Sequence, residues 1–257
     1  MVPGRGAAFL MLLFTVGAIW YFMRRARRGQ VPTVRPIAGL QATPEAVGRA
    51  TEMGRPVFYV PGRTEINTAG AAQTLAGLEM LGYVSELSAQ YEVPLRTAVA
   101  APTVLPVAEE IVRQGYQRAG KPDQYRPEFV QFLSSEQFAF AAGCLDIMHR
   151  EKVGAAFLIG EFQAESLMLA EGAAQVGAIV VSGTARTFQI PFFVVASDYT
   201  LIGEEIFAAG AYLSRDPDRL GGLAGQDWAK ILAVVLTLLG AVLGTFGEDV
   251  IKRLLSW

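Results

Sequence analysis

Acidic side chains in the second half of the chain have the types and spacing best suited to chemistry. Glu161 and Glu165 lie one helical turn apart, directly after an apolar run. Asp198, Glu204 and Glu205 follow a later run. In an open parallel sheet, ligands bind at the carboxyl ends of the strands, and clustered carboxylates can hold Mg²⁺ or Ca²⁺ there. The candidate ligand-binding residues are therefore Glu161, Glu165, Asp198 and Glu204.

The same acids also have a purely structural interpretation. Asp198 is a natural helix cap, and acids in the first turn of a helix complement the helix dipole. Cys144 and His149 are five residues apart on one expected helix, which separates them by about 140° around its axis. We therefore interpret Cys144 as a core residue and His149 as a helix-end residue.

No known catalytic signature accompanies these residues. The segment PGRTE after the first expected strand has neither a GxGxxG fingerprint nor a Walker lysine. A GxSxG nucleophile elbow is absent as well. The chain contains one histidine, which excludes multi-histidine metal sites. The sequence thus predicts no cofactor and no specific metal site, and it argues against an enzyme.

Composition sets further limits on function. The chain has 257 residues, of which 52% are hydrophobic and 18% charged, with a net charge of −2. That balance gives no reason to expect nucleic-acid binding. A single cysteine, Cys144, excludes an internal disulfide framework.

The acids must be positioned by a middle region in which short apolar runs alternate with helix-like runs. Expected strands are Pro56–Val60, Leu95–Ala100, Phe129–Leu133, Ala155–Ile159, Ala178–Val181 and Ile190–Ala196. Expected helices begin at Thr43-Pro44, Thr68, Leu105, Ser134, Glu161 and Thr200. This alternation predicts a Rossmann-like α/β fold: a layered, mostly parallel sheet of about six strands with helices on both faces.

One connection does not fit this pattern. The last two expected strands are separated by about six residues, which is too short for a helical crossover. Either this pair is antiparallel, or one of the two strand assignments is wrong.

Both ends of the chain are strongly apolar. Ala7–Met23 is just long enough to span a bilayer and is followed by four arginines. Because positive charge stays on the cytoplasmic side, this segment is predicted to be a signal anchor with the domain in the cytoplasm. The residues that set this orientation are Arg24, Arg25, Arg27 and Arg28.

The second apolar segment, Ile231–Phe246, is shorter. Gly240 and Gly244 form a GxxxG spacing, which favours close helix pairing in lipid. The segment either spans the bilayer with help from its flanks or lies in the plane of the membrane. The predicted organisation is therefore an anchor (1–28), a tether (29–42), an α/β domain (43–214), a linker (215–227) and a C-terminal membrane helix with its tail (228–257).

Several long motifs resemble an uncharacterised family of prokaryotic membrane proteins built on a domain of unknown function. The motifs include GRATEMGRPVFYVPG (Gly48–Gly62) and QIPFFVVASDYTLIGEE within Gln189–Ser214. The resemblance covers roughly 42–227. It implies a membrane-associated α/β domain with no established activity, cofactor or catalytic residue.

These observations leave three functional hypotheses. The first is a self-associating scaffold, held at the bilayer and forming a homo-oligomer or binding another membrane protein. The second is a membrane-tethered enzyme or small-ligand receptor with its site at the strand carboxyl ends. The third is an accessory subunit of a larger membrane complex.

Overall fold

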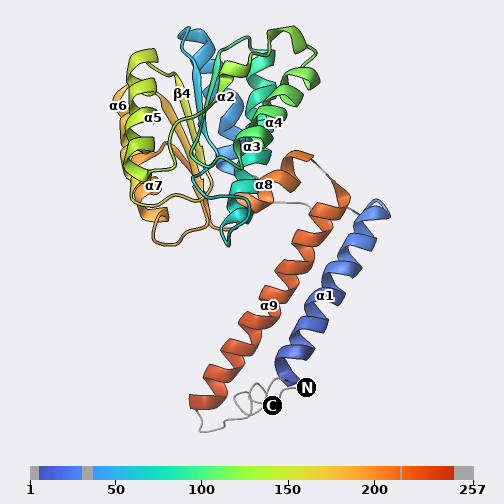
Figure 1. The fold of residues 1–257 in the computed structure, drawn as a ribbon. Coiled ribbons are helices and arrows are strands. Elements are labelled where there is room, and N and C mark those ends of the chain that lie inside the picture. The colour runs from blue at the N-terminus through green and yellow to red at the C-terminus, as the bar shows by residue number, and fades with distance from the viewer. Residues whose placement is uncertain (1–5, 31–36, 215, 246–257) are drawn as a thin grey trace. The chain divides into compact units, whose positions relative to one another are not determined.

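The chain forms two units. A computed structural model describes residues 6–30, 37–214 and 216–245. Unit 1 comprises Met1–Arg35 and Ser214–Trp257, and unit 2 comprises Pro36–Leu213. The terminal helices belong to unit 1 and the sheet belongs to unit 2 (Figure 1).

Unit 2 contains a six-stranded sheet in the order β3-β2-β1-β4-β5-β6, in which every neighbouring pair is parallel. The strands are β1 (Val57–Val60), β2 (Leu95–Val99), β3 (Val130–Phe132), β4 (Ala155–Ile159), β5 (Ile179–Thr184) and β6 (Tyr199–Ile202). The predicted fold class is confirmed. Strands β1 and β4 are buried along their whole length, which explains their continuous apolar runs.

Helices cover both faces of the sheet (Figure 1). The described helices of unit 2 are α2 (Ala38–Glu52), α3 (Ala71–Gln90), α4 (Leu105–Arg118), α5 (Gln137–Glu151), α6 (Glu165–Gln175), α7 (Ile190–Ala196) and α8 (Glu205–Ser214), with short 3₁₀ turns at Pro122–Gln124 and Pro127–Phe129. Val57 and Tyr59 face the core beneath α2, α3 and α4. Phe58 and Val60 face the core beneath α5, α6 and α7, as the alternation of a strand requires.

The strand prediction for Ile190–Ala196 is wrong, because this segment forms helix α7. Pro191 occupies the first helical turn, where its fixed φ angle suits a helix. Val195 is 84% exposed, which would not be expected in a buried strand. The true last strand, β6, begins at Tyr199, and α7 supplies the crossover that the parallel pairing of β5 and β6 needs.

Five of the six expected helices begin elsewhere than predicted; two of them, α3 and α5, begin at Ala71 and Gln137, after the expected Thr68 and Ser134. Helix α2 starts at Ala38, so Thr43 and Pro44 lie inside it, and the Thr43 hydroxyl donates to the carbonyl of Gly39 (2.8 Å). Burial of one face of α2 outweighs the proline signal. Helices α6 and α8 begin at Glu165 and at Glu205, which leaves Glu161 and Thr200 outside them.

Unit 1 contains α1 (Gly6–Arg27) and α9 (Pro217–Thr245), which pack side by side (Figure 1). Both are long and apolar enough to cross a membrane by length and composition. Helix α9 includes most of the region expected to be a linker. Part of the expected tether (31–36), Phe246 and the whole tail from Glu248 to Trp257 lie outside the described residues.

The two helices of unit 1 run antiparallel, and glycines bring them together. A Cβ at Gly221 would lie 2.6 Å from the Cα of Met23, and a Cβ at Gly225 would overlap Ile19. This GxxxG spacing, one that the sequence interpretation missed, allows backbone contact. A Cβ at Gly244, by contrast, would meet no described atom within 4 Å.

Candidate functional site

The order of the strands defines where a site is expected. From β1 and β4 at the centre, the chain adds β2 and β3 on one side and β5 and β6 on the other. In open α/β sheets ligands bind at such a switch point, outside the carboxyl ends of the strands. The residues that follow β1, β4 and β5 are therefore the ones to consider.

Two glycine-containing turns meet at the switch point. Gly62 follows β1 and Gly160 follows β4, with φ angles of +79° and +143°. A Cβ at Gly160 would lie 2.9 Å from the Cα of Gly62, so the turns are in backbone contact. The amide of Arg63 donates to the carbonyl of Glu161 at 2.9 Å. These contacts fix the backbone of Glu161 at the centre of the carboxyl edge.

The carboxylate of Glu161 is buried and paired. Glu161 is 4% exposed, and its Oε1 accepts hydrogen bonds from Nε (2.8 Å) and Nη2 of Arg186. Its Oε2 accepts a long hydrogen bond of 3.5 Å from Nε2 of Gln73. A Cβ at Gly70, directly before α3, would overlap this carboxylate. Glu161 therefore fills the N-terminal end of α3, a position that binds phosphate in nucleotide-binding folds.

Gln73 links this carboxylate to the segment after β5. Its Oε1 accepts hydrogen bonds from the amide of Ala185 (2.8 Å) and the hydroxyl of Thr184 (3.3 Å). The hydroxyl of Thr184 in turn accepts from the amide of Arg186 at 3.2 Å. The backbone and side chain of Arg186 are therefore both held in place.

Glu165 is fully buried at the start of α6. Its carboxylate accepts hydrogen bonds from the amide of Gln163 (3.0 Å) and from Nε2 of Gln137 (2.5 Å). Nε of Arg63 lies 3.9 Å away, and Nη2 of Arg63 donates to the carbonyl of Ser135 (3.1 Å). Glu165 therefore links the loop between β4 and α6 to helix α5 and to the loop after β1.

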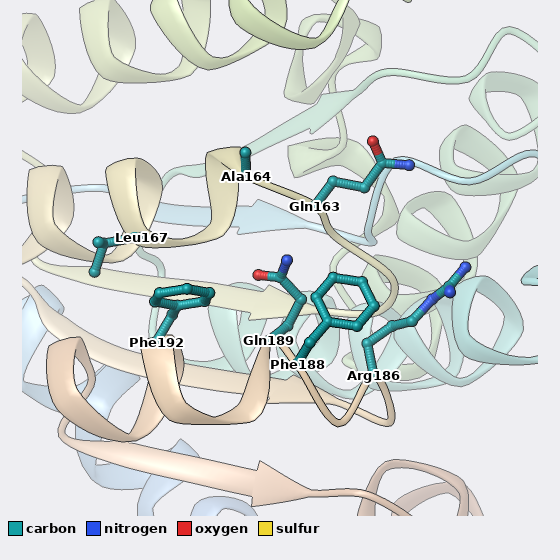
Figure 2. Close-up of a pocket in the computed structure, with 7 residues that line it drawn as sticks. All are labelled: Gln163, Ala164, Leu167, Arg186, Phe188, Gln189 and Phe192. Atoms are coloured by element: carbon teal, nitrogen blue, oxygen red, sulfur yellow. The ribbon is translucent and has the colours of Figure 1, made fainter.

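An open pocket of about 600 Å³ lies beside this charged network. Ala164 and Leu167, at the start of α6, form one wall, and the segment entering α7 forms the other (Figure 2). The second wall carries the rings of Phe188 and Phe192 on either side of Gln189 (Figure 2). The full lining is Gln163, Ala164, Leu167, Arg186, Phe188, Gln189 and Phe192.

Arg186 belongs to both the network and the pocket. Its side chain is 44% exposed, and its guanidinium carbon lies 5.7 Å from the centre of the Phe188 ring. Arg186 is the one charged residue among the described residues that line the pocket. The wall is otherwise apolar or amide-bearing, so the pocket presents one guanidinium, already paired with Glu161 on one side, beside two aromatic rings.

Two of the predicted acids lie elsewhere. Asp198 lies at the amino end of β6, where its carboxylate accepts a hydrogen bond from the amide of Val180 (2.8 Å). Because helix α7 precedes it, Asp198 lies before a strand and not after one. It is therefore at the amino edge of the sheet, whereas Glu161, which follows β4, is at the carboxyl edge. Glu204 follows β6, two strands or about 10 Å from β4. Within the described ranges, no group of three or more His, Cys, Asp or Glu residues could hold a metal ion.

Cys144 and His149 occupy the positions expected of them. Cys144 is buried in the core beneath α5 and α6. Burial, together with the nearby charge of Glu165, raises the pKa of the Cys144 thiol. His149 is exposed in the last turn of α5. A neutral, buried thiol is a poor nucleophile, so neither residue belongs to the candidate site.

Sequence reasoning identified the two glutamates at the carboxyl edge but missed their basic and amide partners. Arg186 lies in the segment TARTFQ, which the apolar pattern presents only as a short connection between two expected strands. Gln73 lies on a helix of mostly small and apolar residues. Because residues 190–196 form a helix, this segment is the loop at the carboxyl end of β5, where ligand-binding residues are expected.

Comparison with known proteins identifies the family of this chain. Neither a search of curated proteins nor a search of solved structures finds a match to this chain. One family model matches residues 3–255, which include both terminal helices and the sheet. The chain therefore belongs to the family described as a domain of unknown function (DUF6754).

Proposed function

We propose that this chain is a membrane-anchored receptor domain that binds small organic anions at the carboxyl edge of its sheet. The observation that carries the proposal is the double position of Arg186, which pairs with buried Glu161 and also lines the open pocket. An exposed guanidinium held by a buried carboxylate is pre-organised, so binding an anion costs little side-chain ordering.

The rest of the pocket favours a ligand with an apolar part. Phe188, Phe192 and Leu167 offer apolar surface within the volume range of ordinary small-molecule sites. An aryl or alkyl carboxylate, or the corresponding phosphate, satisfies both features. Its anionic group would meet Arg186, and its apolar body would pack against the two rings.

Binding of a dinucleotide in the usual manner is disfavoured. Glu161 already fills the space at the N-terminus of α3, next to Gly70. A phosphate placed there would meet a buried carboxylate of like charge, which is costly in a poorly solvated position. The proposed ligand therefore binds one strand further along, between the ends of β4 and β5.

A thermal-shift series on the full chain in nanodiscs tests this proposal. The ligands are benzoate, phenyl phosphate and hexanoate, with benzamide and hexanol as neutral counterparts. We expect the anions to raise the melting temperature of unit 2 and the neutral compounds to leave it unchanged. Equal shifts for charged and neutral compounds, or no shift with any anion, would contradict the proposal.

A blocking variant separates this pocket from other sites. Ala164 is exposed on the pocket wall, so Ala164→Trp fills the space without removing a buried contact. Ala142 is exposed on α5 and is not part of the lining, so Ala142→Trp is the matched control. The shift should disappear in the first variant and persist in the second.

The membrane-anchored part of the proposal rests on the two apolar helices of unit 1. We place unit 2 in the cytoplasm, because Arg24, Arg25, Arg27 and Arg28 follow the first apolar segment. Protease added to right-side-out vesicles should leave unit 2 intact, whereas protease added to inverted vesicles should cleave it. Cleavage only in right-side-out vesicles would contradict this orientation.

Self-association is the second candidate function. It is favoured by four exposed apolar side chains on α7 and β6, here called the apolar strip: Phe192, Val194, Val195 and Ile202. Exposed apolar side chains that gather on one part of a surface often mark a protein interface. A second copy of this chain could bury the strip, as the scaffold hypothesis requires, and Gly240 and Gly244 on α9 could add helix pairing within the bilayer.

Size measurement in nanodiscs or mild detergent tests this second function. We expect an oligomer that Val195→Glu dissociates, because the charge would lie in the buried interface. Leu75→Glu, at an exposed position on α3, is the matched control and should not change the size. A strict monomer across concentrations would rule out self-association.

A further inference from the structure

A second cavity, of about 520 Å³, lies at the basic end of helix α1 and is independent of the proposed receptor pocket. It is lined by Trp20, Tyr21, Arg24, Arg25, Arg28 and Gln30. Among the described residues of this lining there is no carboxylate. Three arginines around one cavity make it strongly electropositive, so the ligand must be an anion.

The structure divides the four arginines into two classes. Nε and Nη2 of Arg27 donate to the two carboxylate oxygens of Asp218 on α9, at 2.5 and 2.8 Å, so its charge is already compensated. Arg24, Arg25 and Arg28 form no ion pair with any carboxylate in the described part of the chain. The arginines that line the cavity are therefore those without a described carboxylate partner. Arg27, which has such a partner, is not part of the lining.

The lining side chains are also positioned by one another. The guanidinium of Arg24 lies over the ring of Trp20, 4.6 Å from its centre, in a cation–π contact. Nε of Arg25 donates to Oε1 of Gln30 at 2.6 Å. Each contact holds a guanidinium at the cavity while leaving other N–H groups available to a ligand.

The surroundings point to a phosphate carried by lipid. Trp20 and Tyr21 are exposed on a helix that is apolar enough to cross a membrane, and such rings prefer the headgroup level. Arginine forms bidentate hydrogen bonds to phosphate. We infer that Trp20, Arg24, Arg25 and Arg28 form a binding site for the headgroup phosphate of an anionic phospholipid.

Retention of lipid by the full chain tests this inference. Protein in a non-ionic detergent is mixed with equal amounts of phosphatidylglycerol and phosphatidylcholine, and bound lipid is counted by native mass spectrometry. We expect phosphatidylglycerol to be retained preferentially. Arg24→Gln and Arg28→Gln should each lower that retention about five-fold, the effect of one basic residue near an anionic lipid.

Arg27→Gln is the matched control, because it removes the same charge from the same helix end but from outside the cavity. It should leave retention within about twofold of the original value. An equal loss in Arg27→Gln and Arg24→Gln would overturn the site in favour of diffuse charge. Unchanged retention in both cavity variants would overturn it as well.

A competition arm separates the two possible sources of phosphate. Inorganic phosphate at the concentration of the lipid should not displace phosphatidylglycerol, because free phosphate lacks acyl chains to pack on α1. Full displacement would assign the cavity to free phosphate and overturn the lipid site. Circular dichroism of each variant checks that α1 remains helical.

Discussion

The carboxylate of Glu161 fills the space that a side chain at residue 70 would need. A Cβ at Gly70 would overlap Oε2 of Glu161, while Oε1 of the same carboxylate binds Arg186. Glycine at this position therefore allows the charged network to form at the N-terminus of α3. The side chain of Glu161 therefore occupies the switch point of the sheet, and the open pocket lies to one side of it.

Gly70→Ala should destabilise unit 2 by about 1–3 kcal/mol, because the added methyl must displace a buried, hydrogen-bonded carboxylate. Gly48→Ala is the matched control: a Cβ there meets no described atom within 4 Å, and it lies inside helix α2. The control should stabilise by about 0.5–1 kcal/mol. Urea unfolding of both variants gives the comparison, and equal effects would contradict the overlap at Gly70.

Glu161 and Arg186 should be energetically coupled. Arg186→Gln leaves a buried carboxylate without its cation, and the expected loss is about 2–3 kcal/mol, less than for a fully buried pair because Arg186 is 44% exposed. Glu161→Gln/Arg186→Gln should lose less than the sum of the single variants. A double-mutant cycle measured by urea unfolding tests this, and additive losses would show that the pair contributes nothing.

Glycines Gly221 and Gly225 should hold the two helices of unit 1 together. The rings of Phe22 and Trp228 stack at 6.1 Å, so Phe22→Cys/Trp228→Cys, with Cys144 replaced by Ala, should be joined by a bis-maleimide cross-linker that bridges the two helices. Gly225→Leu should abolish the cross-link, because its side chain would overlap α1.

Gly244→Leu provides the control for this experiment, since no described atom lies within 4 Å of a Cβ at that position. The cross-link should form in this variant as in the parent. Loss of the cross-link with Gly244→Leu, together with its survival in Gly225→Leu, would transfer the pairing role to the GxxxG at Gly240 and Gly244.

Unit 2 should lose stability in alkali. Burial raises the pKa of Tyr116 to about 12, above its ordinary value of 10.0. The native state therefore keeps this proton when the unfolded state has lost it, so stability is full below about pH 10 and falls up to about pH 12. Each pH unit in that window costs about 1.4 kcal/mol for this group.

Tyr116→Phe isolates this contribution. The variant keeps the ring among its aromatic neighbours Tyr125 and Phe129 but has no proton to lose. Its urea midpoint should fall less steeply with pH than that of the parent. Identical slopes would show that Tyr116 ionises as freely in the folded state as in the unfolded state. Tyr59, whose pKa burial also raises, should keep some slope in both proteins.

The layered sheet could be predicted because its central strands are continuous apolar runs that no other element explains. The segment 190–196 has the same composition, yet it forms a helix. Whether such a run is a strand depends on what covers it, and Val195 is 84% exposed. The order of the strands likewise depends on contacts between distant segments, which periodicity does not encode.

The candidate site was only partly predictable for the same reason. Glu161 could be found because it directly follows a buried strand. Its partner Arg186 is 25 residues further along and reaches it only through the pairing of β4 and β5. Asp198 was misplaced because its position relative to the sheet depended on the assignment of α7.

Photoaffinity labelling with an azido-substituted phenyl phosphate tests the proposed anion site most directly. The probe is bound to the full chain in nanodiscs, irradiated, and located by peptide mass spectrometry. We expect labels on Leu167, Phe188 or Phe192 that excess phenyl phosphate prevents and Ala164→Trp abolishes, while Ala142→Trp retains them. Labels confined to other segments, or labels on the pocket that persist in Ala164→Trp, would contradict a receptor site at this edge of the sheet.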